Sequence, residues 1–390
     1  MDYFLEADHY QICKQGYLAC GDSFYSIKAD DGIISVLADG LGSGIKASVL
    51  ATLTTTMAAS FMASKMDIKH AAEIILETLP VCSYRNIGYS TFTIIEAKHD
   101  GHVRIIEHDN PPYALIRDQQ IIKVEKQEIP IKTFRRSNLY YSEIKLVPED
   151  RIVYYSDGVT QCGMGLPYFP LGWQEKGVEN YLLSMLKANR SISAREITKS
   201  VARKAREYDS NRAADDITCA ALYLRNPRRT LLLTGPPYKK EHDAVLAQIA
   251  TDFVGRKIIC GGTTSAILSR ELNIPVKVNL NEVRKGGEIP PTADMEGFDL
   301  VTEGTITLSR ALRALEEDAS LEAMPDNAVK RLILILLDSD IIEFVVGTKI
   351  NEAHQDPALP KDLEIRRNLM KQFMRVLEKK HLKTTRVLFV

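Results

Sequence analysis

The sequence predicts an α+β domain followed by a smaller α/β domain with a mainly parallel sheet. Up to about residue 224, short apolar strand-like segments dominate and the helical segments come in pairs, an order typical of a layered α+β domain. Beyond residue 230, strand-like and helix-like segments alternate, which indicates parallel strands joined by helices. The polar stretch RNPRRT at 225–230 contains a proline and separates the two patterns, so we predict domains at 1–226 and 227–390.

The first domain is expected to be built mainly from strands. Apolar residues alternate or run continuously in the strand-like segments, at 24–27, 33–38, 90–96, 103–108, 114–116, 151–156 and 217–224. Apolar residues recur at intervals of three and four in the helical segments, at 43–65, 68–79, 178–187 and 194–208.

The second domain is expected to alternate strands and helices. Its predicted strands are 231–234, 257–260, 276–280, 298–302, 341–346 and 385–390. Its predicted helices are 240–253, 263–271, 307–317, 327–337 and 362–379.

The balance of charges excludes some classes of function. The 390 residues include 50 basic and 51 acidic side chains, a formal net charge of -1, so the chain as a whole gives no electrostatic reason to bind nucleic acid or an anionic membrane. The apolar run at 332–337 is far shorter than the roughly 20 residues of a membrane span and ends at Asp338. The acidic amino terminus does not look like a secretory signal, so we expect a cytoplasmic protein.

The cysteines and histidines do not form the usual metal-binding patterns. The six cysteines are scattered with no C-x-x-C pair, which argues against a zinc ribbon or a redox dithiol. The eight histidines form no H-x-x-x-H or H-E-x-x-H pair, so a histidine-based metal site is not expected.

Aspartates at the ends of predicted strands are the strongest functional signal. They are Asp22, Asp39, Asp157, Asp215 and Asp216. Carboxylates that met at one rim of a sheet would repel one another unless cations lay between them. Oxygen ligands without cysteine or histidine select Mg²⁺ or Mn²⁺, and two such ions can turn a water molecule into a nucleophile that attacks a phosphate ester.

Each of these motifs also has a simpler interpretation. An Asp-Gly pair after a strand is most often a turn. The combination of four such motifs is more specific than any one of them.

In combination, the motifs resemble the metal-dependent protein phosphatase (PPM) family, in particular its bacterial branch typified by the stage II sporulation protein E phosphatase. The segments that carry the resemblance are ADGLGSG at 38–44, YSDGVT at 155–160 and DDIT at 215–218, with Gly-Asp at 21–22 in the place of the first acidic motif. Asn-Pro-Pro at 110–112 and the segment at 161–165 support it. The resemblance covers roughly residues 16–224.

The resemblance implies a sandwich of two antiparallel β-sheets flanked by helices, with two Mn²⁺ or Mg²⁺ ions at one end. By position, Asp39 would bridge both ions and be central to catalysis with Asp157. The Gly40 carbonyl and Asp22 would bind one ion, and Asp157 and Asp215 the other. Asp216 stays open as a neighbouring or solvent-facing carboxylate.

The resemblance further implies a serine/threonine phosphatase that acts in signal transduction. The expected substrate is a phosphorylated regulatory protein, such as an anti-sigma-factor antagonist. Some relatives carry a histidine that can protonate the leaving group where this chain has Leu41, so no general acid can be named. Lys46, at the start of the helix after Gly44, is either a phosphate-binding residue or a solvated surface lysine.

The second domain resembles no family that we recognise. Gly261, Gly262 and Thr263 follow a predicted strand and begin a predicted helix, a place where backbone N–H groups can bind an anion. Plain turns and helix caps explain the same residues. We expect a regulatory or ligand-binding domain for a small anionic ligand, and regulatory input through it because no sensor segment precedes the first domain. A homodimer is left open.

A second hypothesis belongs to another class. The chain would then be a catalytically weak scaffold, or a metabolite-binding signalling module, that binds a partner without turnover. The presence of all four expected aspartate ligands argues against it.

Overall fold

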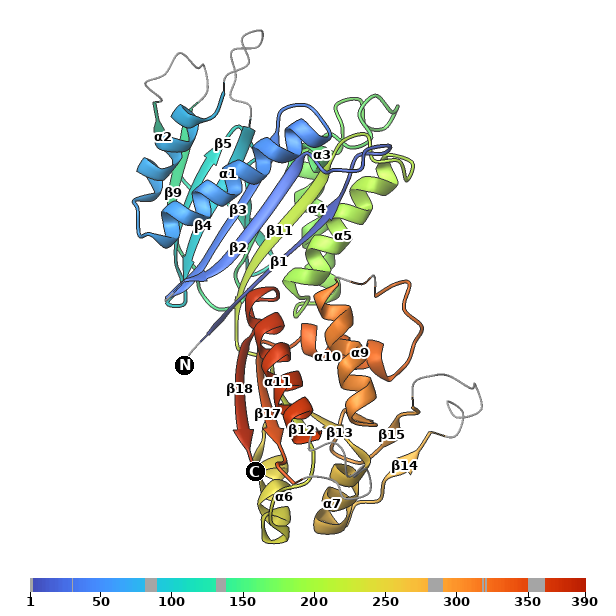
Figure 1. Ribbon diagram of the computed structural model, residues 1–390. Helices are drawn as coiled ribbons and strands as arrows, with labels where there is room; N and C mark the ends of the chain where they lie inside the picture. The colour runs from blue at the N-terminus through green and yellow to red at the C-terminus, as the bar shows by residue number, and fades with distance from the viewer. Residues whose placement is uncertain are drawn as a thin grey trace. The chain divides into compact units, whose positions relative to one another are not determined.

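The computed structural model describes residues 3–29, 31–80, 90–130, 138–279, 290–317, 319, 321–349 and 362–390. The chain divides into two compact units, Met1–Asn226 and Pro227–Val390. Figure 1 labels their helices and strands.

A six-stranded antiparallel sheet forms one layer of the first unit. Its strands lie in the order β2 (Asp22–Ala29), β3 (Gly32–Gly40), β4 (Ser90–Lys98), β5 (His102–His108), β9 (Leu139–Lys145) and β8 (Gln127–Ile129). Two helices, α1 (Ile45–Ala63) and α2 (Ile68–Thr78), cover its outer face (Figure 1). Alternate residues of β3 such as Ile34, Val36 and Ala38 pack against these helices, because side chains of a strand point to opposite faces in turn.

A five-stranded antiparallel sheet forms the other layer. Its strands lie in the order β1 (Phe4–Ile12), β11 (Ile217–Arg225), β10 (Arg151–Tyr155), β6 (Ala114–Arg117) and β7 (Gln120–Ile122). The helices α4 (Gln174–Ala188) and α5 (Ala194–Tyr208) pack on it. The N-terminus of α5 carries a reciprocal capping box between Ser193 and Glu196.

The two sheets face each other, so the first unit is a β-sandwich flanked by helices. A hydrogen bond between the Ser35 and Tyr154 hydroxyls joins β3 of one sheet to β10 of the other in the buried interior. The predicted α+β class and the helix-flanked sandwich are therefore confirmed.

Four strands of the sandwich, β1, β7, β8 and β9, were not predicted from the sequence. The strand β1 contains Glu6, Asp8 and His9, which obscure its apolar pattern. Glu6 is nevertheless buried, because its carboxylate accepts a hydrogen bond at 2.9 Å from the buried Arg225 guanidinium. The strand β9 was missed for a similar reason, since polar and charged residues alternate along it.

The second unit contains a seven-stranded mixed sheet. The strand order is β14 (Lys277–Val278), β15 (Ala293–Asp294), β16 (Leu300–Thr302), β13 (Arg256–Cys260), β12 (Arg229–Thr234), β17 (Ile341–Val346) and β18 (Thr384–Phe389). The last five strands in this order are parallel, as predicted, whereas β14 and β15 add an antiparallel edge. Only two residues of the strand predicted at 276–280 are in β14, and Leu280 lies outside the described residues.

Helices join the parallel strands, as the alternating pattern indicated. They are α6 (Asp243–Asp252), α7 (Gly262–Leu272), α9 (Thr305–Glu316), α10 (Ala328–Leu337) and α11 (Asp362–Lys379), with the short 3-10 helix η1 (Lys240–His242) before α6. The apolar run at 332–337, rejected as a membrane span, lies in α10, where Leu332, Ile333 and Leu336 are buried in the core.

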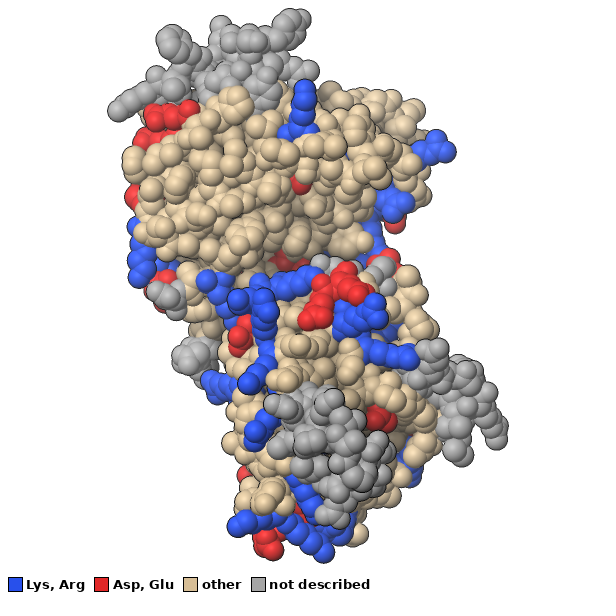
Figure 2. Space-filling model, viewed as in Figure 1, with Lys and Arg blue, Asp and Glu red and all other residues tan. Residues whose placement is uncertain are grey.

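Helix α1 is, within the described residues, the one helix long and apolar enough to cross a membrane by length and composition alone. Its Ala47, Ala51 and Ala58 are buried, two of them in the cluster that the sheet and α2 share. Its exposed side has Lys46 as its single charge, and Figure 2 shows the corresponding face of the first unit as largely free of charged side chains.

Candidate functional site

Two of the expected ligand residues are cross-strand partners. Asp22 is the first residue of β2 and pairs directly with Asp39 near the end of β3. Side chains of directly paired residues lie on the same face of the sheet, with their Cβ atoms about 4.5–5.5 Å apart. The hairpin therefore presents both carboxylates to the same space.

The Asp22 carboxylate is buried, and only one of its two oxygens accepts hydrogen bonds from the described residues. Its Oδ2 accepts hydrogen bonds from the Ser156 hydroxyl at 2.7 Å and the Thr218 hydroxyl at 2.6 Å. Its Oδ1 has no hydrogen-bond partner among the residues that the structure describes. Burial raises the pKa of Asp22 to about 8, with Asp216 and Asp157 adding to the rise and the two hydroxyl hydrogen bonds opposing it.

Asp39 and Asp157 lie close together at the end of the sandwich. Burial raises the pKa of Asp39 to about 10, and the negative charges of Asp22, Asp157 and Asp215 raise it further. Burial and then the charge of Asp215 raise the pKa of Asp157. The Asp39 and Asp157 carboxyl groups are near enough for a hydrogen bond between them.

The structure therefore brings four predicted ligand residues into one group. We call Asp22, Asp39, Asp157 and Asp215 the carboxylate cluster. Gly40, the fifth predicted ligand, is the last residue of β3, and its backbone N–H donates to the Gly21 carbonyl at 3.1 Å.

The neighbouring Asp215 and Asp216 have different surroundings. The Asp216 carboxylate is buried and accepts hydrogen bonds from Lys14 N at 2.8 Å, Gly21 N at 2.9 Å and the Cys20 thiol at 3.1 Å. The Asp215 side chain is partly exposed and lies 3.5 Å from Lys14 Nζ. Asp216 thus holds the segment before β2 in place, and Asp215 stays accessible to a ligand.

Glycines allow the motif segments to approach one another closely. A Cβ atom on Gly40 would lie 2.1 Å from the Ala47 carbonyl oxygen, and one on Gly158 would lie 2.1 Å from the Asp216 carbonyl oxygen. Because any side chain would collide with backbone there, only glycine can follow Asp39 and Asp157 in this arrangement.

Three supporting residues were missed from the sequence. Ser156 and Thr218 orient Asp22, and Lys14 neutralises part of the charge of Asp215. Ser156 and Thr218 are polar residues inside the quoted motifs, a signal that could have indicated them. Nothing in the local sequence indicates Lys14.

Two further predictions concern residues around the cluster. Lys46 lies exposed in the first turn of α1, and the described part of the chain shows no ion pair for it. Leu41 follows Gly40 in the loop before α1, so no imidazole occupies that position.

The predicted ligand residues of the second unit lie between β13 and α7. Gly261 has φ +140°, which favours glycine, and Gly262 and Thr263 are exposed. Within the described part of the chain the buried Thr264 hydroxyl has no hydrogen-bond partner, and it lies 3.2 Å from where a Cβ of Gly261 would be. The N-terminus of α7 has no side-chain cap.

The carboxylate cluster fits hard divalent cations. It offers only oxygen donors, and one buried oxygen, Asp22 Oδ1, has no partner. Mg²⁺ and Mn²⁺ prefer such donors. A bound cation would offset the burial and the neighbouring negative charges that raise the pKa values of Asp22 and Asp39.

A helix-flanked sandwich of two antiparallel sheets with these aspartate motifs places the chain in the class of PP2C-type protein phosphatases, which are hydrolases. Residues 29–225, just over half of the chain, match the family described as Stage II sporulation protein E (SpoIIE). The chain belongs to this family. The matched residues include Asp39, Asp157 and Asp215, and Asp22 lies before them.

Several solved structures are similar to this chain over somewhat more than half of its length. The PP2C phosphatase domain of SpoIIE from Bacillus subtilis, with a fragment of its regulatory domain, has 19% identity and a TM-score of 0.49 and covers 57% of this chain and 63% of that one. The RsbU and RsbW domains of a Mycobacterium tuberculosis protein have 16% identity and a TM-score of 0.47 over 64% of this chain and 68% of that one. RsbX in complex with magnesium has 18% identity and a TM-score of 0.42 over 57% of this chain and 96% of that one.

The chain spans less than two thirds of the first of these structures. No curated protein is similar enough to be counted as a relative.

Proposed function

We propose that the chain is a metal-dependent serine/threonine phosphatase that hydrolyses phosphoserine or phosphothreonine on a regulatory protein. The observation that carries the proposal is the carboxylate cluster, four acidic side chains from separate segments with a partnerless buried oxygen among them. Such a cluster costs stability without cations, so a binding function explains it better than a structural one.

We assign the ligands as follows. Asp39 would bridge two cations, Mn²⁺ or Mg²⁺, because the charges of the other three cluster residues all act on its carboxyl group. Asp22 and the Gly40 carbonyl would bind one of them, and Asp157 and Asp215 the other. When bound, the cations would supply Lewis acidity to a water molecule and to the phosphoryl group.

The chain's own residues would position these ligands. Ser156 and Thr218 hold one oxygen of Asp22 and leave the other directed to a cation. Gln161 donates to Asp157 Oδ2 at 2.8 Å and limits its rotation. Lys46, exposed at the start of α1, would attract the phosphate, and with Leu41 in the neighbouring position the leaving group would take its proton from water.

The second unit would regulate this activity. We propose that it binds a small anionic ligand at Gly261, Gly262 and Thr263, at the carboxyl end of a parallel sheet where ligands gather. The uncapped helix N-terminus and the partnerless Thr264 hydroxyl support this site. An anti-sigma-factor antagonist is the proposed type of substrate, the cytoplasm the proposed location, and a homodimer is compatible with both.

A phosphatase assay tests the main proposal. The full chain should hydrolyse an aryl phosphate with Mn²⁺ or Mg²⁺ and lose activity when the metal is chelated. Asp39→Ala and Asp157→Asn should reduce kcat by at least a hundredfold, and Asp294→Asn, an exposed aspartate of the second unit, should not. Equal background activity in wild type and both cluster variants would favour the scaffold hypothesis.

A binding assay tests the second unit. In the metal-free full chain, where the carboxylate cluster holds no cation to bind phosphate, inorganic phosphate and a nucleotide should still bind, as measured by calorimetry, and Gly261→Val should abolish this binding. An aryl-phosphate activity that persists in that variant would separate ligand binding from catalysis. Absence of any binding would leave Gly261 as a helix cap.

A further inference from the structure

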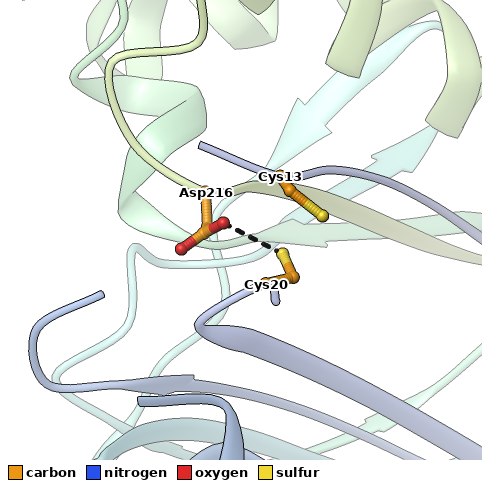
Figure 3. A group of neighbouring side chains, drawn as sticks. All are labelled: Cys13, Cys20 and Asp216. Carbon is orange, nitrogen blue, oxygen red and sulfur yellow. Dashed lines mark hydrogen bonds between the residues drawn. The ribbon is translucent and has the colours of Figure 1, made fainter. Parts of the chain in front are cut away.

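Two cysteines that are seven residues apart meet beside the carboxylate cluster. Cys13 follows β1 and Cys20 precedes β2, so they lie at the two ends of the loop that joins the two sheets. One ligand atom each from Cys13, Cys20 and Asp216 lie within 4.8 Å of one another. Figure 3 shows the Cys20 sulfur directed to the Asp216 carboxylate and the Cys13 side chain beside it. We call these three residues the thiol cluster.

The protein backbone holds the thiol cluster in place. Asp216 accepts hydrogen bonds from the backbone N–H groups of Lys14 and Gly21, the residues next to the two cysteines. Gln15 N donates to the Ala213 carbonyl at 2.9 Å, which ties the same loop to the segment before Asp216. These hydrogen bonds set the backbone positions next to the two cysteines before any ligand arrives.

This arrangement could not be predicted from the sequence. The spacing of Cys13 and Cys20 is not a C-x-x-C motif, and Asp216 lies some two hundred residues away. They meet because β1 and β11 are antiparallel partners, with Ile12 opposite Ile217, while Cys20 is brought back by the start of β2.

We propose that the thiol cluster is a binding site for a soft divalent cation such as Zn²⁺, separate from the carboxylate cluster. Two sulfurs and one carboxylate oxygen would supply three of the four ligands that Zn²⁺ usually takes in proteins, and water would supply the fourth. Sulfur selects Zn²⁺ over Mg²⁺ and Mn²⁺, whereas the oxygen-only carboxylate cluster has the opposite preference. The two neighbouring sites therefore differ in the class of metal that they take.

Binding would replace existing interactions in a balanced way. The Cys20 thiol now donates to Asp216 Oδ1 at 3.1 Å. On binding, each thiol would release its proton to solvent and form a metal–sulfur bond, while Asp216 Oδ1 would exchange the thiol hydrogen bond for the cation. The two backbone hydrogen bonds to Asp216 would stay in place.

The site would stabilise the loop at 13–21. Lys14 in this loop lies 3.5 Å from Asp215 Oδ1, and Tyr17 packs close to Gly44 at the start of α1. A cation that joins the two ends of the loop would fix the position of Lys14 beside the carboxylate cluster. The first expected effect of Zn²⁺ is therefore to reduce the motion of this loop.

Cobalt substitution of the reduced, metal-free full chain tests the proposal. One equivalent of Co²⁺ should give an intense near-ultraviolet sulfur-to-cobalt charge-transfer band, which oxygen ligands cannot produce, and Zn²⁺ should displace it. Cys13→Ser and Cys20→Ser should weaken Co²⁺ affinity at this site at least tenfold. Cys260→Ala, which removes a buried thiol of the second unit, should keep the band.

Two of the variants make the outcome decisive. Cys13 is exposed, so Cys13→Ser is expected to fold even if Cys20→Ser does not. Asp39→Asn should retain the band, which separates this site from the proposed phosphatase centre. Absence of the band in reduced wild type, its persistence in Cys13→Ser, or a Cys13–Cys20 disulfide in the chain as isolated without reductant would overturn the proposal.

Discussion

Asp22 and Asp39 face each other as direct cross-strand partners at the open end of the β2–β3 hairpin. Like charges in this position destabilise a sheet. The neighbouring hydroxyls of Ser156 and Thr218 relieve only Asp22 Oδ2. The pair therefore fits a site whose stability depends on what binds there.

Divalent metal should stabilise the first unit. Because the cations bind the folded carboxylate cluster and not the unfolded chain, Mg²⁺ or Mn²⁺ at about 100 times Kd should add about 2.7 kcal/mol to the free energy of unfolding. The single tryptophan, Trp173, is buried in the first unit, so its fluorescence during urea unfolding reports this unit alone. An unfolding curve that is unchanged by either metal would contradict the assignment.

Asp39→Asn should have opposite effects with and without metal. In the metal-free protein it removes a buried carboxyl group whose raised pKa makes the folded state less favourable at neutral pH, so the free energy of unfolding should rise by about 0.2–1 kcal/mol. Adding Mg²⁺ should not raise the free energy of unfolding of the variant, so with Mg²⁺ present the variant should be less stable than wild type. The measurement is urea unfolding followed by Trp173 fluorescence in both conditions, with Asp294→Asn as the control.

The adjacent Asp215 and Asp216 should respond differently to substitution. Asp216→Ala leaves three donors without their acceptor, two of them backbone N–H groups, and should lower the free energy of unfolding by at least about 1–3 kcal/mol. Asp215→Asn should change the metal-free stability by about 0.5 kcal/mol or less, because the side chain is partly exposed.

Metal titration then separates the two roles. Asp215→Asn should weaken Mn²⁺ affinity at least tenfold, as measured by calorimetry. If Asp215→Asn bound Mn²⁺ like wild type and Asp216→Asn did not, the ligand assignment would have to move to Asp216.

The aspartates of the site could be predicted because they combine two local signals. Asp39 and Asp157 each follow apolar strand residues and precede a glycine, and the close approach of Ala47 and Asp216 explains why that glycine is needed. The sequence also indicated the alternation of strands and helices in the second unit, since that pattern is set by local periodicity.

Features that depend on long-range pairing could not be predicted in the same way. The strand β1 is hidden by polar residues whose partners, such as Arg225 for Glu6, lie about two hundred residues away. The thiol cluster also depends on residues that lie far apart in the sequence. Short-range patterns contain no information about which distant donor will satisfy a buried charge.

The buried ion pair of β1 gives a test of that strand. Glu6→Ala removes the carboxylate opposite the buried Arg225 guanidinium, and breaking a buried pair from one side costs about 3–5 kcal/mol. Urea unfolding by Trp173 fluorescence should show this loss. Glu73→Ala, which removes one member of an exposed pair with His70, should change stability by about 0.5 kcal/mol or less. Equal effects would mean that β1 does not pair with β11 in solution.

Gly158→Ala should damage the carboxylate cluster through the backbone. The added methyl group would lie 2.1 Å from the Asp216 carbonyl oxygen and 3.5 Å from Asp215 Cβ, so α3 (Asp157–Thr160) and the segment before β11 must separate. Separation moves Asp157 away from Asp215, and since both would bind the same cation, Mn²⁺ affinity should fall at least tenfold. Overpacking should also lower the free energy of unfolding by about 3 kcal/mol.

A second glycine provides the control for Gly158→Ala. Gly16→Ala places the same methyl group where no atom lies within 4 Å, at φ +87°, so it measures only the backbone cost of about 1–2 kcal/mol. Its Mn²⁺ affinity should equal that of wild type. If Gly158→Ala also bound Mn²⁺ with unchanged affinity, the close approach of the segments that contain Asp157 and Asp215 would not be needed to hold the cation. The requirement for glycine after Asp157 would then be one of folding alone.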